Sequence, residues 1–175
     1  MSDSTLILKA AAFAARKHRD QRRKDAESSP YINHPLELAR VLSEAGGVTD
    51  VATLCAALLH DTIEDTATSE HELAQSFGPE IAALVSEVTD DKSLPKVERK
   101  SRQVEHAATI SDKAKRIKLA DKICNLTDVA CSPPATWSLE RRREYFDWAK
   151  QVIDRLRGVD AVLESAFDKA YAARP

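Results

Sequence analysis

Apolar residues recur at intervals of three and four positions in almost every segment of this chain. The clearest stripe follows Asp50 and consists of Val51, Leu54, Cys55, Leu58 and Leu59. This spacing puts the side chains on one face of an α-helix, whereas a half-buried strand would alternate at every second residue. Only 4 glycines interrupt the chain, and residues that favour helix are abundant. We therefore predict an all-α fold, a single helical bundle of about eight to ten helices.

Capping residues and breakers between the periodic segments predict where the helices lie. We expect helices around residues 4–18, 96–107, 111–130, 138–157 and 159–172, and others that start at Pro35, after the caps Asp50 and Ser69, and after Gly78-Pro79. Segment 111–130 carries apolar residues on two sides, which predicts that it lies in the middle of the bundle.

The length of the chain, 175 residues, is enough for one compact domain and too short for two of full size, so we expect one domain over residues 1–175. A formal net charge of −2 excludes a global positive field for nucleic acid. No leader and no long apolar run appear, which predicts a cytoplasmic protein without a membrane partner. Cys55, Cys124 and Cys131 are expected to be reduced core residues. Oligomeric state stays open.

Two histidines and two aspartates from three segments are candidate metal ligands, namely His34, His60, Asp61 and Asp121. Imidazole with carboxylate suits Mn, Fe, Co or Zn, and the absence of a cysteine partner argues against a structural zinc site. Taken singly, a histidine is more often a cap or a hydrogen-bonded core group, and Lys118 or Lys122 could pair with Asp121. Because Asp121 lies on or beside an inner helix face, however, it needs a strong cationic partner.

Two further acids follow the His60-Asp61 pair. Glu64 and Asp65 stand at i+3 and i+4 from Asp61, so three carboxylates would crowd one edge of a helical turn. A bound dication offsets their repulsion, and the surplus acids could then orient a water and accept its proton during attack on phosphorus. The alternative is an exposed acidic helix end.

The basic run RKHRDQRRK would ordinarily form a solvated face. It stands just before His34, however, so Arg23 and Lys24 could clamp a phosphate beside the metal. Further candidate cations come from the later charged stretch, Lys92, Lys96 and Lys100.

Six stretches carry a resemblance to a known family, and in chain order they are FAARKHRDQRRKD, PYINHP, AALLHDTIEDT, FGPEIAALVSEVTDDKSLPKVERK, KLADKICNL and EYFDWA. Together they resemble the HD-type phosphohydrolases, and within these the hydrolase domain of RelA/SpoT-type alarmone enzymes. The small alarmone hydrolases of the metazoan SpoT-homologue type are the most similar group.

The resemblance implies an enzyme that hydrolyses the 3′-pyrophosphate of (p)ppGpp to pyrophosphate and GDP or GTP. It implies that one Mn²⁺ is held by His34, His60, Asp61 and Asp121, and that the attacking water is assisted by Glu64 and Asp65. It also places the substrate among Arg23, Lys24, Lys96 and Asn125, with Arg141 and Tyr145 near its far end.

Full-length relatives carry a synthetase domain and regulatory modules after the hydrolase, so this chain is expected to degrade alarmone and not to make it. Thr127 stands where relatives often carry Arg, which puts one phosphate contact in doubt. Two alternatives stay open. One is a phosphatase that acts on NADPH or another 2′- or 3′-phosphorylated nucleotide, and the other is a non-catalytic alarmone-binding module, against which Glu64 and Asp65 argue.

Overall fold

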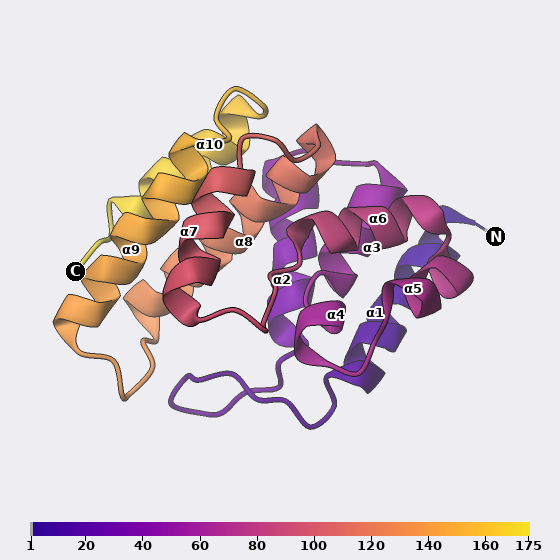
Figure 1. Ribbon diagram of the computed structural model, residues 1–175, viewed down its shortest axis with the longest axis horizontal. Helices are drawn as coiled ribbons and strands as arrows, with labels where there is room; N and C mark the ends of the chain where they lie inside the picture. The colour runs from indigo at the N-terminus through magenta and orange to yellow at the C-terminus, as the bar shows by residue number, and fades with distance from the viewer. Residues whose placement is uncertain (1) are drawn as a thin grey trace.

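Helices make up the regular structure of residues 2–175, which the computed structural model describes, apart from one isolated bridge between Arg22 and Pro30 (Figure 1). The chain forms α1 (Asp3–Lys17), α2 (Asn33–Arg40), the π-helical turn η1 (Val41–Ala45), α3 (Val51–Leu59), α4 (Thr62–Asp65), α5 (Glu70–Phe77), α6 (Pro79–Val88), α7 (Lys96–His106), α8 (Asp112–Cys131), α9 (Leu139–Asp154) and α10 (Ala161–Tyr171). The all-α prediction is confirmed.

Local side-chain caps set several of the helix starts. The Asp50 carboxylate accepts a hydrogen bond from the backbone N–H of Thr53 at 2.9 Å, and the Ser69 hydroxyl accepts one from Glu72 at 3.1 Å. The Glu72 side chain lies 2.8 Å from Lys17 Nζ and thereby joins α5 to α1. Helix α2 begins at Asn33, two residues before the expected start at Pro35.

The helices fall into two groups with α2 and α8 between them (Figure 1). At one end α1, α3, α5 and α6 pack against one another, and at the other end α7, α9 and α10 surround the outer part of α8. Helix α8 contacts both groups and buries apolar residues on two sides, including Ile117, Leu119, Cys124 and Leu126. The prediction that this segment lies in the middle of the bundle is therefore correct.

Helix α8 also carries polar side chains that are buried. Lys118 is 8% exposed and Lys122 is 3% exposed, although both belong to a helix with apolar residues on either flank. A buried ammonium group is unfavourable unless anions or hydrogen-bond acceptors surround it. These lysines therefore mark a polar cavity beside α8.

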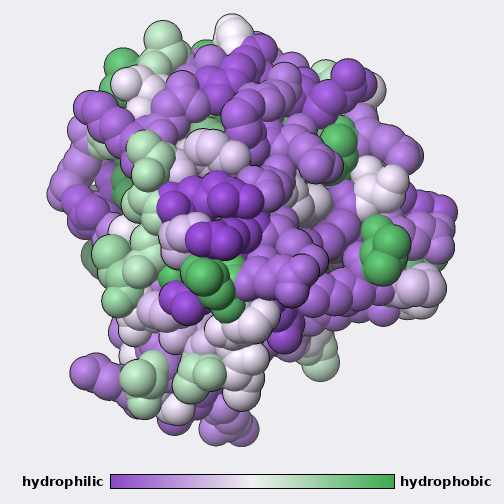
Figure 2. All heavy atoms as spheres, turned by 90° about the vertical axis from the view of Figure 1, so that its left-hand side faces the viewer, coloured by the Kyte–Doolittle hydropathy of each residue, from purple (hydrophilic) through white to green (hydrophobic). Residues whose placement is uncertain are grey.

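The cysteine prediction is correct at two positions and wrong at the third. Cys55 and Cys124 are buried, but Cys131 is exposed because it ends α8, beyond the packed part of that helix. Figure 2 shows the face on the side of α9, where hydrophilic side chains dominate and apolar ones are scattered. None of the helices in the described part of the chain has both the length and the apolar composition needed to cross a membrane.

Candidate active site

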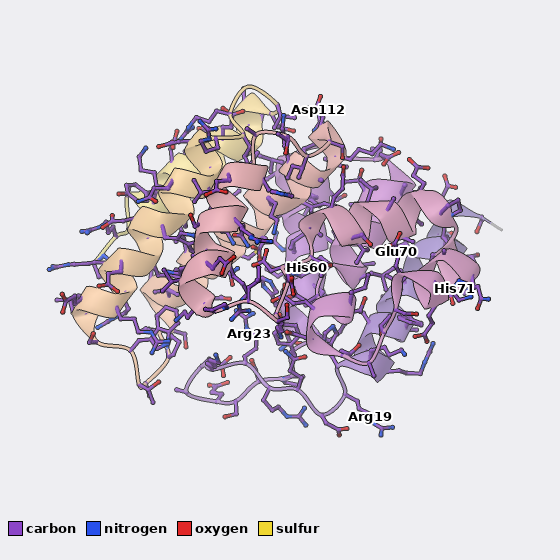
Figure 3. The ribbon with its side chains drawn as sticks, in the orientation of Figure 1. Arg19, Arg23, His60, Glu70, His71 and Asp112 are labelled. Atoms are coloured by element: carbon purple, nitrogen blue, oxygen red, sulfur yellow. The ribbon has the colours of Figure 1, made fainter. Side chains whose placement is uncertain are left out.

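Three of the four expected metal ligands converge where the two helix groups meet. His34 comes from the first turn of α2, His60 from the C-terminal end of α3, and Asp121 from the middle of α8. One potential ligand atom from each lies within 4.8 Å of the others. Both imidazoles are buried, and Figure 3 shows His60 near the centre of the molecule.

Hydrogen bonding leaves one nitrogen of His60 free to bind a cation. Its Nδ1 lies 2.9 Å from the carbonyl oxygen of Ala57, which can only accept, so Nδ1 carries the proton. The buried Nε2 makes no hydrogen bond, and once it is deprotonated it offers a lone pair to a cation. A carbonyl that orients the far nitrogen is the usual companion of a metal-binding histidine. The donor set therefore fits a divalent ion.

Asp61 is next to the group formed by His34, His60 and Asp121 but is not part of it. Its Oδ2 is 2.8 Å from His60 Nε2, and the same oxygen accepts a hydrogen bond from the hydroxyl of Tyr31. Burial opposes ionisation of Asp61, but the charge of His60 and its contact with the carboxylate hold the pKa of Asp61 below its usual value. Asp61 is thus an ionised oxygen donor next to the ligand set.

Asp121 has two neighbours on its own helix. Lys122 Nζ lies 3.0 Å from Oδ2, and Asn125 Nδ2 donates to Oδ1 at 2.6 Å. Although burial opposes ionisation, Lys122 and His34 hold the pKa of Asp121 well below its usual value. Lys118 does not share this role, since its ammonium donates to the carbonyl of Val88 at 2.7 Å. Lysine pairing therefore accounts for one oxygen of Asp121, while Oδ1 lies 3.2 Å from His34 Nε2.

The two surplus acids lie next to these groups on the single turn of α4. Glu64 Oε2 accepts the backbone N–H of Asp90 at 3.2 Å. Burial, reinforced by the charges of Asp61 and Asp90, raises the pKa of Glu64 to about 7. Asp65 accepts a hydrogen bond from Gln21 and pairs with Lys92. An acid with a pKa near neutrality can take up a proton from water at physiological pH.

A cavity of about 580 Å³ extends from these acids, and most of the expected substrate-binding residues line it. Those that do are Lys24, Lys96, Asn125, Arg141 and Tyr145. Arg23 does not, because it forms an ion pair with Asp128 and faces an adjoining cavity of about 360 Å³. Figure 3 shows Arg23 on the loop after α1, below His60 in that view.

The structure adds an aromatic row that the sequence interpretation missed. Tyr145 lies between Trp137 and Trp148, with ring centroids 5.4 Å away on each side. Cations cover the row, since Arg141 lies 4.5 Å from the Trp137 ring centre and Lys122 lies 4.5 Å from that of Trp148. The i, i+3 spacing of Tyr145 and Trp148 was a usable signal. Trp137 belongs to the loop before α9 and gave none.

Such a row has the properties of a nucleotide-binding surface. Aromatic faces stack on bases, and guanidinium and ammonium groups contact phosphates. The site thus combines a set of metal-ligating side chains, two acids and a cationic aromatic wall in one cavity.

Comparison with known proteins gives consistent results. The HD domain family matches residues 10–147. "Guanosine-3′,5′-bis(diphosphate) 3′-pyrophosphohydrolase MESH1" of Xenopus tropicalis is 55% identical over 170 residues, which cover 97% of this chain and 95% of the relative. The protein of that name from Homo sapiens is 52% identical over 173 residues, covering 99% and 97%.

Solved structures agree as well. The structure described as "A metazoan ortholog of SpoT hydrolyzes ppGpp and plays a role in starvation responses" superposes with a TM-score of 0.94 at 48% identity, covering 97% of this chain and 95% of the other. A protein of Listeria monocytogenes EGD-e superposes with a TM-score of 0.67 at 27% identity, covering 83% of this chain and 98% of the other.

Proposed function

This chain belongs to the HD domain family, and on that basis we propose that it is a guanosine-3′,5′-bis(diphosphate) 3′-pyrophosphohydrolase that converts (p)ppGpp to pyrophosphate and GDP or GTP. One observation carries the proposal: His34, His60 and Asp121 bring their ligand atoms within 4.8 Å of one another in the cavity that Glu64 and Asp65 also line. Two relatives that carry the name of this activity match the chain over almost their whole length.

The HD domain implies a divalent metal, and we propose Mn²⁺ held by His34, His60, Asp61 and Asp121. Such an ion supplies Lewis-acid chemistry when bound, because it polarises phosphoryl oxygens and makes water more acidic. The carboxylates and the imidazoles of His34 and His60 supply the oxygen and nitrogen donors that Mn²⁺ accepts.

Glu64 and Asp65 divide the work on the attacking water in this proposal. Glu64, whose pKa is raised to about 7, accepts the proton that the water loses as it attacks phosphorus. Asp65 orients the water, and an ionised carboxylate is well suited to this role since it accepts hydrogen bonds through both oxygens.

Cations at the cavity wall receive the phosphates. Lys24, Lys96 and Arg141 line the cavity. Each lysine supplies a point charge, and the guanidinium of Arg141 supplies a planar fork of donors. Asn125 and Tyr145 contact the nucleoside. Arg23 reaches a phosphate when it exchanges its contact with Asp128 for the substrate.

A 2′- or 3′-phosphorylated nucleotide such as NADPH is a second candidate substrate. The adjoining cavity of about 360 Å³ shares Lys24, Asn125 and Trp137 with the first and gives room for a longer molecule. Both substrates would use the same ligands and acids, so only their relative turnover separates them.

A product assay tests the proposal. Purified protein loaded with Mn²⁺ is incubated with ppGpp, pppGpp and NADPH, and released pyrophosphate, phosphate and nucleotide are measured beside metal content. We expect pyrophosphate with GDP or GTP, and loss of both after chelation. Metal-loaded protein that releases no pyrophosphate from ppGpp would overturn the assignment, and a higher kcat/KM for NADPH would favour the second candidate.

A further inference from the structure

Asp65 is connected to α1 by a short chain of hydrogen bonds. His18, the C-terminal cap of α1, places its Nδ1 2.6 Å from Oε1 of Gln21. The Nε2 of Gln21 donates in turn to Oδ2 of Asp65 at 2.7 Å. The bond between Gln21 and Asp65 joins residues that lie 44 positions apart in sequence.

Elementary hydrogen-bond chemistry gives the direction of each bond. The ionised Asp65 carboxylate only accepts, so Gln21 must present its amide nitrogen to it and its oxygen to His18. An amide oxygen also only accepts, hence Nδ1 of His18 must carry a proton. The orientation of the Gln21 amide is therefore determined by its two neighbours.

Two backbone hydrogen bonds hold Gln21 in place. Its backbone N–H donates to the carbonyl of His18 at 2.9 Å, and its own carbonyl accepts from Tyr31 at 3.1 Å. The His18 ring is 2% exposed and packs against Tyr31 with ring centroids 4.9 Å apart. Tyr31 in turn donates to Asp61. The segment that follows α1 therefore reaches both Asp61 and Asp65.

Asp65 lacks other rigid support. It ends the single turn of α4, and its second oxygen pairs with Lys92, whose side chain is 48% exposed. An exposed lysine holds a carboxylate weakly because both partners keep several rotamers. Gln21 is the partner that restricts the Asp65 side chain.

We propose that His18 and Gln21 are positioning residues that hold Asp65 in the orientation in which it directs the attacking water. This inference rests on the proposed function of the site. His18 lines neither the cavity beside Glu64 nor the adjoining one, so it does not contact the substrate, and its hydrogen bond to Gln21 connects it to Asp65.

Two substitutions at His18 separate this role from simple packing. The side-chain amide of Asn in His18→Asn places its nitrogen near the position of Nδ1 and can still donate to Gln21. In His18→Gln the amide nitrogen lies near the position of Nε2 and cannot. We expect His18→Asn to keep kcat within about threefold of wild type and His18→Gln to lower kcat about tenfold or more with KM little changed, since misplacement of a reacting group costs rate and not affinity.

The surface pair His71 and Gln75 provides a matched control. These side chains lie 2.9 Å apart and are exposed on α5, and Figure 3 shows His71 at the edge of the molecule, away from His60. His71→Asn and His71→Gln should leave kcat and KM unchanged. Thermal unfolding and metal content are measured for every variant.

A double-mutant cycle supplies the second readout. In the Asp65→Ala background, His18→Gln should cause no further loss of kcat, because the group that it positions is already absent. If His18→Gln does not fold, Gln21→Met, which keeps the length of the side chain without its hydrogen bonds, takes its place with the same expected loss.

The outcomes distinguish the two proposals. Wild-type protein without pyrophosphate release from ppGpp would overturn the proposed function and this inference with it. Active wild type with full kcat in His18→Gln or Gln21→Met, equal losses in both His18 variants, or additive losses in the cycle would overturn the positioning role alone.

Discussion

The backbone N–H of Asp90 donates to Oε2 of Glu64 across 3.2 Å. Asp90 is itself anchored, because Gln103 Nε2 donates to both oxygens of its carboxylate at 2.9 and 2.7 Å. The loop after α6 thus sets Glu64 between two other carboxylates, those of Asp61 and Asp90, in a partly buried position. Burial and these charges together raise the pKa of Glu64 to about 7. Its proton affinity therefore suits a proton acceptor near neutral pH.

Glu64→Gln should separate catalysis from metal binding. We expect the variant to keep its metal and to slow hydrolysis by a factor of about a hundred or more, because the amide cannot accept the proton of the attacking water. Released pyrophosphate and metal content are measured on the same preparation. Loss of the metal in Glu64→Gln would contradict the separate roles.

The raised pKa of Glu64 also predicts a stability effect in metal-free protein. The folded state holds the proton of Glu64 more tightly than the unfolded state does, so this stabilisation is complete below about pH 4.5 and is lost as pH rises through about 7. Glu64→Gln removes the loss. We expect its Tm in chelator to exceed that of wild type by several degrees at pH 8 and to match it near pH 4.5. A Tm difference that does not change with pH would contradict the shift.

His60→Ala should abolish metal binding, since it removes a buried nitrogen that the rest of the site cannot replace. Metal content after dialysis is the measurement. The exposed histidine at the end of α7 gives the control, and His106→Ala should keep a full complement of metal. Equal metal content in the two variants would count against His60 as a ligand.

Lys122→Met should destabilise metal-free protein. Lys122 is 3% exposed and pairs with Asp121 at 3.0 Å, so its removal leaves a mostly buried carboxylate without its main cation. Breaking a buried pair in this way costs about 3 kcal/mol, and Mn²⁺ should restore part of the loss. Lys113 pairs with Glu80 at the surface, and Lys113→Met should cost less than about 1 kcal/mol. Chemical denaturation with and without Mn²⁺ measures both variants.

Arg141→Ala should weaken substrate binding more than turnover. Arg141 lies over the Trp137 ring at 4.5 Å and lines the cavity. We expect KM to rise about tenfold with little change in kcat, because the lost contact is equal in ground and transition states. Arg143, which donates to the carbonyl of Pro175 away from the cavity, provides the control. An unchanged KM in Arg141→Ala would show that the phosphates bind elsewhere.

Local patterns predicted most of the helices, although not the single turn α4 or the π-helical turn η1. The stripe after Asp50 became α3 with its cap in place, and segment 111–130 became the central helix α8. Such patterns work because a helix buries one face, and the residues that form this face are three or four positions apart. The same logic failed at Cys131, because periodicity does not reveal where neighbouring helices stop covering α8.

Residue chemistry likewise identified His34, His60 and Asp121 before their positions were known, since two imidazoles and a carboxylate in inward-facing segments are rarely left unpartnered. Their roles as ligands stay a prediction that metal analysis will test. Arg23 shows the limit of this reasoning, because its preference for Asp128 over the cavity depends on a side chain 105 positions away.

Packing between distant segments determines which polar groups meet at the site. No pattern within a single segment shows this. Gln21 reaches Asp65 because the segment after α1 lies beside α4, and Lys122 lies over the Trp148 ring because α9 packs against α8. Helix positions depend on residues a few places apart and can be read locally, whereas hydrogen bonds and ion pairs between helices depend on the orientation of whole elements, which many weak contacts determine jointly.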